Sequence, residues 1–181
     1  MKSLKILLSA FAMAALFATS ALAQGQASIS ATADVVTDVT LTGVQSLDFG
    51  TLTEAQVDAG VTVALSSAAA DLGKFQMTSL TSGQAVVFTL SAPSVLTATS
   101  TPDLSGGTAQ DDIPFTATAT YTETDGTPGA GTDDFSSGTL SKTVTATTAY
   151  VYVGGSLNSG AAAGNYQGQY SGDITLSVYY D

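Results

Sequence analysis

Short runs of alternating apolar and polar residues make up most of this chain, and clusters of Gly, Ser, Asp and Pro separate them. This rhythm predicts short antiparallel β-strands, each with one buried face and one exposed face. We expect strands at residues 28–35, 38–42, 45–49, 61–65, 74–78, 85–90, 115–122, 139–146, 149–153 and 166–180. A helical turn is expected only at the alanine-rich residues 66–71.

So many short strands in a chain of 181 residues favour two sheets packed face to face, an immunoglobulin-like antiparallel β-sandwich of the all-β class. Segments rich in Gly, Pro, Ser and Asp are predicted to be the loops between the strands. The longest loop, residues 124–138, has almost no apolar side chains at 125–134. We expect this loop to be a mobile excursion on the surface.

The first 23 residues have the order of a cleavable secretory signal peptide. Lys2 and Lys5 precede an apolar run at residues 6–17, and small residues follow at 21–23. The run is too short for a permanent membrane anchor, and no later segment is apolar enough to span a bilayer. We therefore predict a signal peptide at 1–23 and a single exported domain at 24–181, in the periplasm, at the cell surface or outside the cell.

The charge of the chain argues against nucleic acid as a partner. It has four Lys and Arg residues in all against 15 Asp and Glu residues. Because two lysines leave with the signal peptide, the mature chain has a formal charge of 2 − 15 = −13. Binding to phosphates requires basic patches that this chain does not have. It also has no cysteine, so burial and strand pairing must supply its stability without disulfides.

Most catalytic chemistry is excluded by the residues that are missing. The sequence has no His, Cys, Arg or Trp, which removes the usual general base, thiol nucleophile and soft metal ligands. The only glutamates are Glu54 and Glu123, and the adjacent Ser141 and Lys142 would point to opposite faces of a strand. We predict a protein that is not an enzyme and needs no cofactor.

Two kinds of binding site remain open alternatives. Carboxylates in loops can hold calcium, and the candidates are Asp111, Asp112, Asp125, Asp133 and Asp134. Acidic residues in such loops are more often simply solvated. Exposed aromatic rings can stack on sugars, and tyrosines are frequent near the C-terminus, although at least one set of them should be core: Tyr150, Tyr152, Tyr166, Tyr170, Tyr179 and Tyr180.

The C-terminal segment carries the most specific pattern. It predicts one long amphipathic strand with a single apolar face, formed by Tyr170, Ile174, Leu176, Val178 and Tyr180. Gly168 lies fourteenth from the end, since 181 − 13 = 168, and Tyr180 is the penultimate residue. In these features the segment resembles the subunits of pili that periplasmic chaperones and outer-membrane ushers assemble.

A wider resemblance rests on residues 33–41, 47–52, 150–157 and 163–168 in that order. In these motifs the chain resembles an uncharacterised family of secreted bacterial domains that is similar to spore coat protein U and, more remotely, to fimbrial subunits. The resemblance implies an immunoglobulin-like sandwich and a surface or extracellular location, but no settled activity. It also implies a periplasmic chaperone as a partner, although the disulfide common near the first strand of pilins is missing.

The comparison with pilins suggests assembly by β-strand addition, in which a donor strand supplies backbone hydrogen bonds and alternate side chains fill a groove. The donor would be the new N-terminus, with Ile29, Ala31, Ala33 and Val35 on one face. The alternative is that this segment folds back as the first strand of its own domain. The leading hypothesis is a structural or adhesive surface subunit that associates with itself or with other surface subunits; the second is a self-contained secreted binding module for glycan or calcium.

Overall fold

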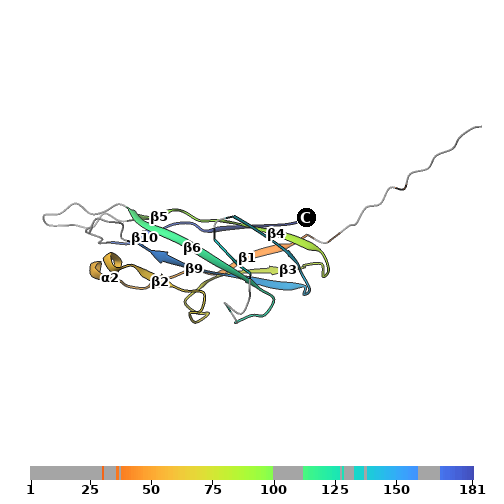
Figure 1. Ribbon diagram of the computed structural model, residues 1–181, viewed down its shortest axis with the longest axis horizontal. Helices are drawn as coiled ribbons and strands as arrows, with labels where there is room; N and C mark the ends of the chain where they lie inside the picture. The colour runs from red at the N-terminus through yellow and green to blue at the C-terminus, as the bar shows by residue number, and fades with distance from the viewer. Residues whose placement is uncertain are drawn as a thin grey trace, which may run out of the picture. The chain divides into compact units, whose positions relative to one another are not determined.

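The computed structural model describes residues 30, 36, 38–99, 112–126, 128, 133–136, 138–158 and 168–181. Apart from Ser30, they belong to one compact unit that spans Val36–Asp181. The elements in this unit are β1 (Thr40–Gln45), α2 (Glu54–Ala59), β2 (Val61–Val63), β3 (Gly73–Thr78), β4 (Ala85–Ser91), β5 (Val95–Ala98), β6 (Asp112–Thr122), β7 (Asp134–Phe135), β8 (Gly138–Thr143), β9 (Thr148–Leu157), β10 (Tyr170–Ser171) and β11 (Thr175–Tyr180) (Figure 1).

These strands form two sheets, and every strand pair is antiparallel. The larger sheet has the order β1-β3-β9-β6-β5-β10, with β2 added to β9 and β7 added to β6. The smaller sheet has the order β11-β4-β8. The prediction of an all-β protein with antiparallel sheets is therefore confirmed.

One hydrophobic cluster contains side chains from both sheets. The ring of Phe88 on β4 lies against the ring of Tyr121 on β6, with 5.1 Å between their centroids. Around this pair, the larger sheet contributes Met77, Val151 and Val153, and the smaller sheet contributes Val86, Leu90 and Leu176. Burial of this apolar surface is the main force that stabilises the unit, because no disulfide is present in the chain.

The predicted alternation of buried and exposed residues is clearest in β6. The side chains of one face are buried: Phe115, Ala117, Ala119 and Tyr121. Thr116 and Thr118, which lie between them, are exposed. Thr120 departs from the pattern, because it is fully buried. Its hydroxyl has no hydrogen-bond partner among the described residues. The outer face of the larger sheet is therefore covered by other residues at Thr120.

Several predicted element boundaries were wrong. The strand predicted at 45–49 does not form, because β1 ends at Gln45 and residues 46–49 are outside any strand. Residues 66–71, where a helical turn was expected, form turns and bends. The one helix of the described residues, α2, lies earlier in the chain, where Thr53 and Gln56 form a capping box around its first turn. No strand was predicted at β5 or β7, and β7 lies within the predicted loop 124–138. Both form strands because they pair with β6.

The prediction of a single strand at 166–180 was also wrong. The described part forms two strands, since β10 pairs with β5 in the larger sheet and β11 pairs with β4 in the smaller sheet. Between them Gly172 passes close to the β5 side, where an added Cβ would lie 2.8 Å from Pro93 Cγ and 3.1 Å from Leu96 Cδ2. The chain therefore crosses from one sheet to the other at a position where only glycine fits.

Among the described residues, no helix has both the length and the apolar character needed to cross a membrane.

Candidate functional site

Among the described strands, β1 and β10 are the ends of the larger sheet and β11 and β8 are the ends of the smaller one, and β1 and β11 are the two ends considered next. Within the described residues, β1 pairs only with β3, and β11 pairs only with β4. Each therefore has one row of backbone N–H and C=O groups that no described strand satisfies. Such an edge is a template for pairing with another strand.

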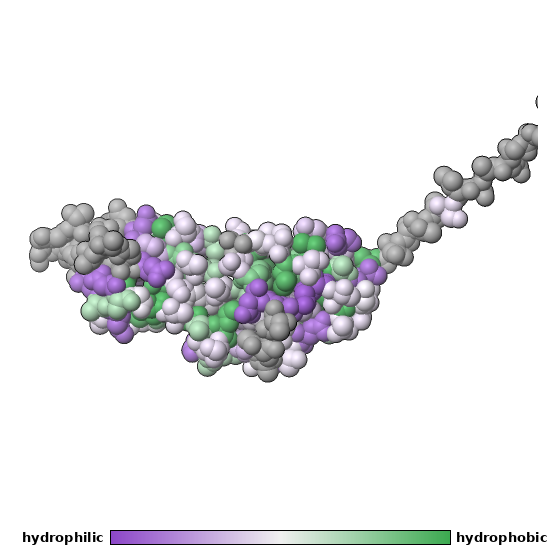
Figure 2. Space-filling view, in the orientation of Figure 1, coloured by the Kyte–Doolittle hydropathy of each residue, from purple (hydrophilic) through white to green (hydrophobic). Residues whose placement is uncertain are grey.

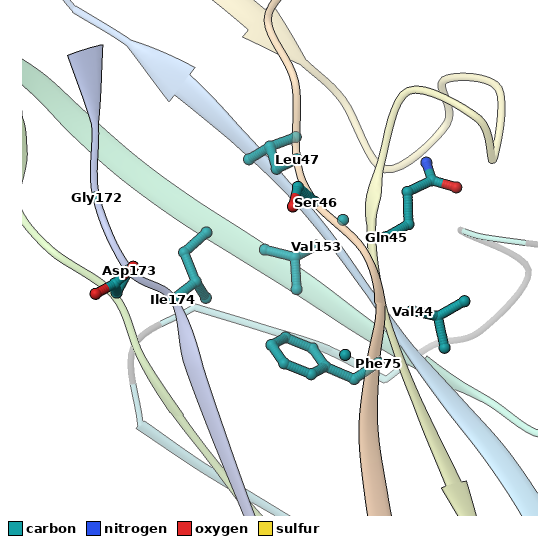
Figure 3. Close-up of a pocket in the computed structure, with 11 residues that line it drawn as sticks. Val44, Gln45, Ser46, Leu47, Phe75, Val153, Gly172, Asp173 and Ile174 are labelled. Atoms are coloured by element: carbon teal, nitrogen blue, oxygen red, sulfur yellow. The ribbon is translucent and has the colours of Figure 1, made fainter. Parts of the chain in front are cut away.

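A pocket of about 350 Å³ lies between residues adjoining these two edges (Figure 3). One wall is formed by residues 43–47, at the end of β1 and just after it, and the other by residues 172–174, which lead into β11. The floor comes from β3 and β9. We call this the edge groove, and its lining side chains include Leu47, Phe75, Val153 and Ile174.

The edge groove opens onto the hydrophobic core. Val153 belongs to the buried cluster, and Leu47, Phe75 and Ile174 are partly buried against it. In Figure 3 these side chains turn towards the space between the two walls, whereas Val44 points away from it. Val44 is 49% exposed, one of two large apolar side chains that are exposed in the described part of the chain. The groove therefore gives solvent access to apolar side chains beside two open strand edges.

A side chain on β1 holds one wall of the edge groove in place. Gln45 Nε2 donates hydrogen bonds to the carbonyl oxygens of Ala70 at 2.6 Å and Leu72 at 2.7 Å. The carbonyl oxygen of Ala69 also lies within hydrogen-bond distance of this amide nitrogen, at 3.2 Å. These bonds fix the turn before β3 against the end of β1, so the wall is set by tertiary contacts.

The residues predicted for the assembly strand divide between the two sheets. Leu176 is buried in the core, and Ile174, Val178 and Tyr180 are partly buried against it. The hydroxyl of Tyr180 accepts a hydrogen bond of 2.8 Å from the backbone N–H of Thr81. Tyr170 lies on β10 in the other sheet, and Gly168 precedes that strand with φ of 117°. The predicted donor residues Ile29, Ala31, Ala33 and Val35 lie outside the described residues.

A polar cluster covers the outer face of the larger sheet. Lys74 on β3 extends over the rings of Tyr150 and Tyr152 on β9, with Nζ at 4.7 and 5.7 Å from their centroids. Its ammonium group bonds Asp125 Oδ1 at 2.5 Å, and the Tyr152 hydroxyl donates to the same oxygen at 2.7 Å. Gly126 N–H in turn donates to the Tyr152 hydroxyl. This network ties the segment after β6 to the sheet.

The network shifts the pKa of each of its titratable groups. Burial works to lower the pKa of Lys74, but its hydrogen bond to Asp125 and the neighbouring charges outweigh burial and raise it. The hydrogen bonds from Lys74 and Tyr152 lower the pKa of Asp125. Burial and the bond to Asp125 raise the pKa of Tyr152. All three shifts favour the charged lysine, the charged aspartate and the neutral tyrosine of the folded state.

Glu123, one of the two glutamates considered for catalysis, is engaged in a structural network. Its Oε1 accepts hydrogen bonds from the Tyr121 hydroxyl at 2.8 Å and from Thr145 N–H at 2.7 Å. The Thr145 hydroxyl donates to Oε2. Burial would raise the pKa of Glu123, but these bonds outweigh it and lower the pKa. An ionised carboxylate with both oxygens occupied in this way serves to join β6 to the end of β8.

The calcium candidates do not form one cluster. Asp125 pairs with Lys74, and Asp133 pairs with Lys142 at 2.6 Å. Asp112 Oδ1 accepts from the Thr97 hydroxyl, and Asp134 is exposed on β7. In the described residues no group of three or more acidic, His or Cys side chains is suited to a metal ion. Asp111 lies outside those residues.

Among the tyrosines that the structure describes, only Tyr179 is largely exposed, at 53%. Tyr152 is 1% exposed, yet it lies under the polar cluster and outside the core between the sheets. Tyr166 is outside the described residues. On the face seen in Figure 2, hydrophobic surface forms separate green patches among white and purple ones. Tyr150, Tyr170 and Tyr180 are partly buried, so the described tyrosines offer one largely exposed ring for stacking on a sugar.

Sequence reasoning missed Lys74, Gln45 and the groove-lining Phe75. Lys74 is one of only two lysines after residue 5, and its position in a predicted strand of a highly acidic chain was a usable signal for an ion pair. Its partner could not be predicted, because Asp125 is 51 residues away in a loop.

The fold and the edge groove define an all-β protein with two antiparallel sheets, one core and an opening beside the edge strands β1 and β11 that both polar and apolar groups line. A scan against protein-family models finds no match for the chain. A search of curated proteins also finds no match.

Proposed function

We propose that this chain is a non-catalytic structural or adhesive subunit of the cell surface that joins its neighbours by β-strand addition. In this proposal residues 1–23 direct export, and the two sheets form an immunoglobulin-like β-sandwich. A strand supplied by another copy completes it. The resemblance to fimbrial subunits and to the spore coat protein U group supports the same proposal.

The observation that carries the proposal is the edge groove. An isolated domain normally protects its sheet edges and closes its core against water. Here two edge strands flank an opening of about 350 Å³ onto the partly exposed side chains of Leu47, Phe75 and Ile174. A strand in this opening would satisfy backbone groups of β1 or β11 and cover those side chains at once.

The segment at residues 28–35 has suitable dimensions for the donor. Eight residues in extended conformation span roughly 26 Å, against about 20 Å for the six residues of β11. Its alternation places Ile29 and Val35 on the face that would enter the groove. The alanines between them suit the narrow part of a groove, and the serines and threonine opposite suit solvent.

The test is the oligomeric state of the chain from residue 24 onward, with and without residues 24–35, measured by size-exclusion chromatography with light scattering. We expect the longer chain to form oligomers that residues 24–35, added as a peptide in excess, reduce to a complex of one chain and one peptide. The truncated chain should stay monomeric and bind the peptide.

A matched pair of variants separates strand addition from other association. Ile29→Asp places a charge on the groove-facing side and should abolish the oligomers, whereas Ser30→Asp adds the same charge to the opposite side and should keep them. A monomer in all forms that ignores the peptide, or equal behaviour of the two variants, would contradict the proposal.

A further inference from the structure

A second hollow lies on the outer face of the larger sheet. It is an open depression of about 460 Å³ beside β2, β6, β7 and β9. None of its lining residues takes part in the edge groove. We call it the hydroxyl hollow after its polar lining side chains, Thr62, Ser66, Thr118, Asp134, Ser136 and Ser156.

The hydroxyl groups reach this hollow from separate segments of the chain. Ser156 on β9 is paired in register with Thr62 on β2 and with Thr116 on β6. The Thr62 and Ser156 hydroxyls lie 2.9 Å apart, and either can be the donor. Each hydroxyl can donate one hydrogen bond and accept two, so the group can adapt to a ligand that carries hydroxyls of its own.

The charge of the hollow selects among polar ligands. Asp134 is the one titratable side chain in its lining, and no lysine lines it. An anionic ligand would meet a carboxylate with no cation to offset it. A single carboxylate is also too few for a calcium ion, which takes six to eight oxygen ligands.

Most of the surface that lines the hollow is apolar, and the hydroxyl groups and Asp134 supply its polar part. Ala64 and Leu65 contribute to this apolar lining, whereas the Phe135 side chain packs against the core. A ligand that matches the whole lining needs hydroxyl groups around its edge, to bond the polar side chains, and C–H groups on one of its faces, to contact the apolar ones. A neutral pyranose sugar has this combination, and pockets of a few hundred Å³ suit ligands of that size.

We propose that the hydroxyl hollow binds one neutral pyranose unit of a glycan, with Thr118, Thr62 and Ser156 as its hydrogen-bonding residues and Asp134 accepting from a sugar hydroxyl. The site is independent of strand addition, since it shares no residue with the edge groove. A shallow site of this kind gives affinities of about millimolar.

The test uses the full chain, isotope-labelled and purified from a host that exports it. Backbone amide resonances are followed during titration with glucose, galactose, N-acetylglucosamine and cellobiose, and separately with glucuronic acid. With at least one neutral sugar we expect saturable shifts at the amides of Thr62, Thr118 and Ser156. Glucuronic acid should bind more weakly than its neutral counterpart, glucose.

Matched variants locate the site. Thr118→Val keeps the shape of an exposed side chain and removes its hydroxyl, and it should weaken binding about tenfold. Thr139→Val makes the same change on β8 of the smaller sheet and should leave binding unchanged. No response to any neutral sugar at about 50 mM, tighter binding of glucuronic acid, or an equal effect of the two variants would overturn the proposal. Oligomer formation is measured separately, so failure here leaves strand addition untouched.

Discussion

Tyr152 combines an apolar ring with a hydroxyl that makes two directed hydrogen bonds. Its hydroxyl donates to Asp125 Oδ1 and accepts from Gly126 N–H, both at 2.7 Å. The ring is 1% exposed and lies under Lys74. Loss of the hydroxyl alone would take the acceptor away from the Gly126 N–H and remove one hydrogen bond to the carboxylate that holds Lys74.

Tyr152→Phe should therefore destabilise the protein by about 1–2 kcal/mol, since it removes one bond to a charged group and one to a backbone donor. Denaturant unfolding followed by circular dichroism measures this change. Tyr150→Phe is the matched control on the same strand and should cost less than about 0.5 kcal/mol, because its ring stays under Lys74. Equal losses in the two variants would show that the Tyr152 hydroxyl has no special role.

At the scale of elements, β9 is the strand that organises the larger sheet. It pairs with β3 and β2 along one edge and with β6 along the other. Two adjacent glycines, Gly154 and Gly155, lie in its centre and are buried. They are required by close approach, since a Cβ on Gly155 would lie 2.5 Å from Phe115 Cε2 and 2.9 Å from Thr116 O.

Gly155→Ala should destabilise the protein by about 1–3 kcal/mol, because one contact is with backbone that cannot move without disturbing the β6–β9 ladder. Thermal unfolding gives the readout. Gly43→Ala in β1 is the control, since its added Cβ would find only Phe75 Cε1, at 4.0 Å. If both variants melt at the temperature of the unmodified chain, the packing described for β9 is incorrect.

For the whole molecule, the ionisable networks around Lys74 and around Glu123 link stability to pH at both ends of the scale. Glu123 and Asp125 have lowered pKa values in the folded state, so their contribution is present above the ordinary carboxyl range and lost as pH falls through it. Lys74, Tyr121 and Tyr152 have raised pKa values. Their contribution is present below about pH 10 and lost as pH rises further.

The free energy of unfolding should therefore be flat near neutral pH and decline below about pH 4 and above about pH 10. Urea unfolding across this range measures it. Asp125→Asn should make the acid decline shallower, whereas Asp173→Asn, which removes an exposed carboxylate before β11, should leave its shape unchanged. A decline of equal steepness in all three proteins would rule out Asp125 as a contributor.

The described structure also explains which parts of the fold the sequence could predict. Alternation along β6 identified its buried face, because side chains in a strand point to opposite sides whatever their partners are. The final segment could not be predicted in the same way. Its apolar residues alternate through Gly172, but the chain changes sheet there, and only the contact with Pro93 and Leu96 marks the change.

The sequence by itself determined the all-β class, the antiparallel pairing, the acidic charge and the absence of cysteine and histidine chemistry, since these follow from composition and local period. Only the tertiary structure decided which edges stay open, what lines the edge groove and which carboxylate meets Lys74. Those features depend on contacts such as Lys74–Asp125, which join residues 51 positions apart. No local pattern encodes such a pairing, because it exists only once the sheets have formed.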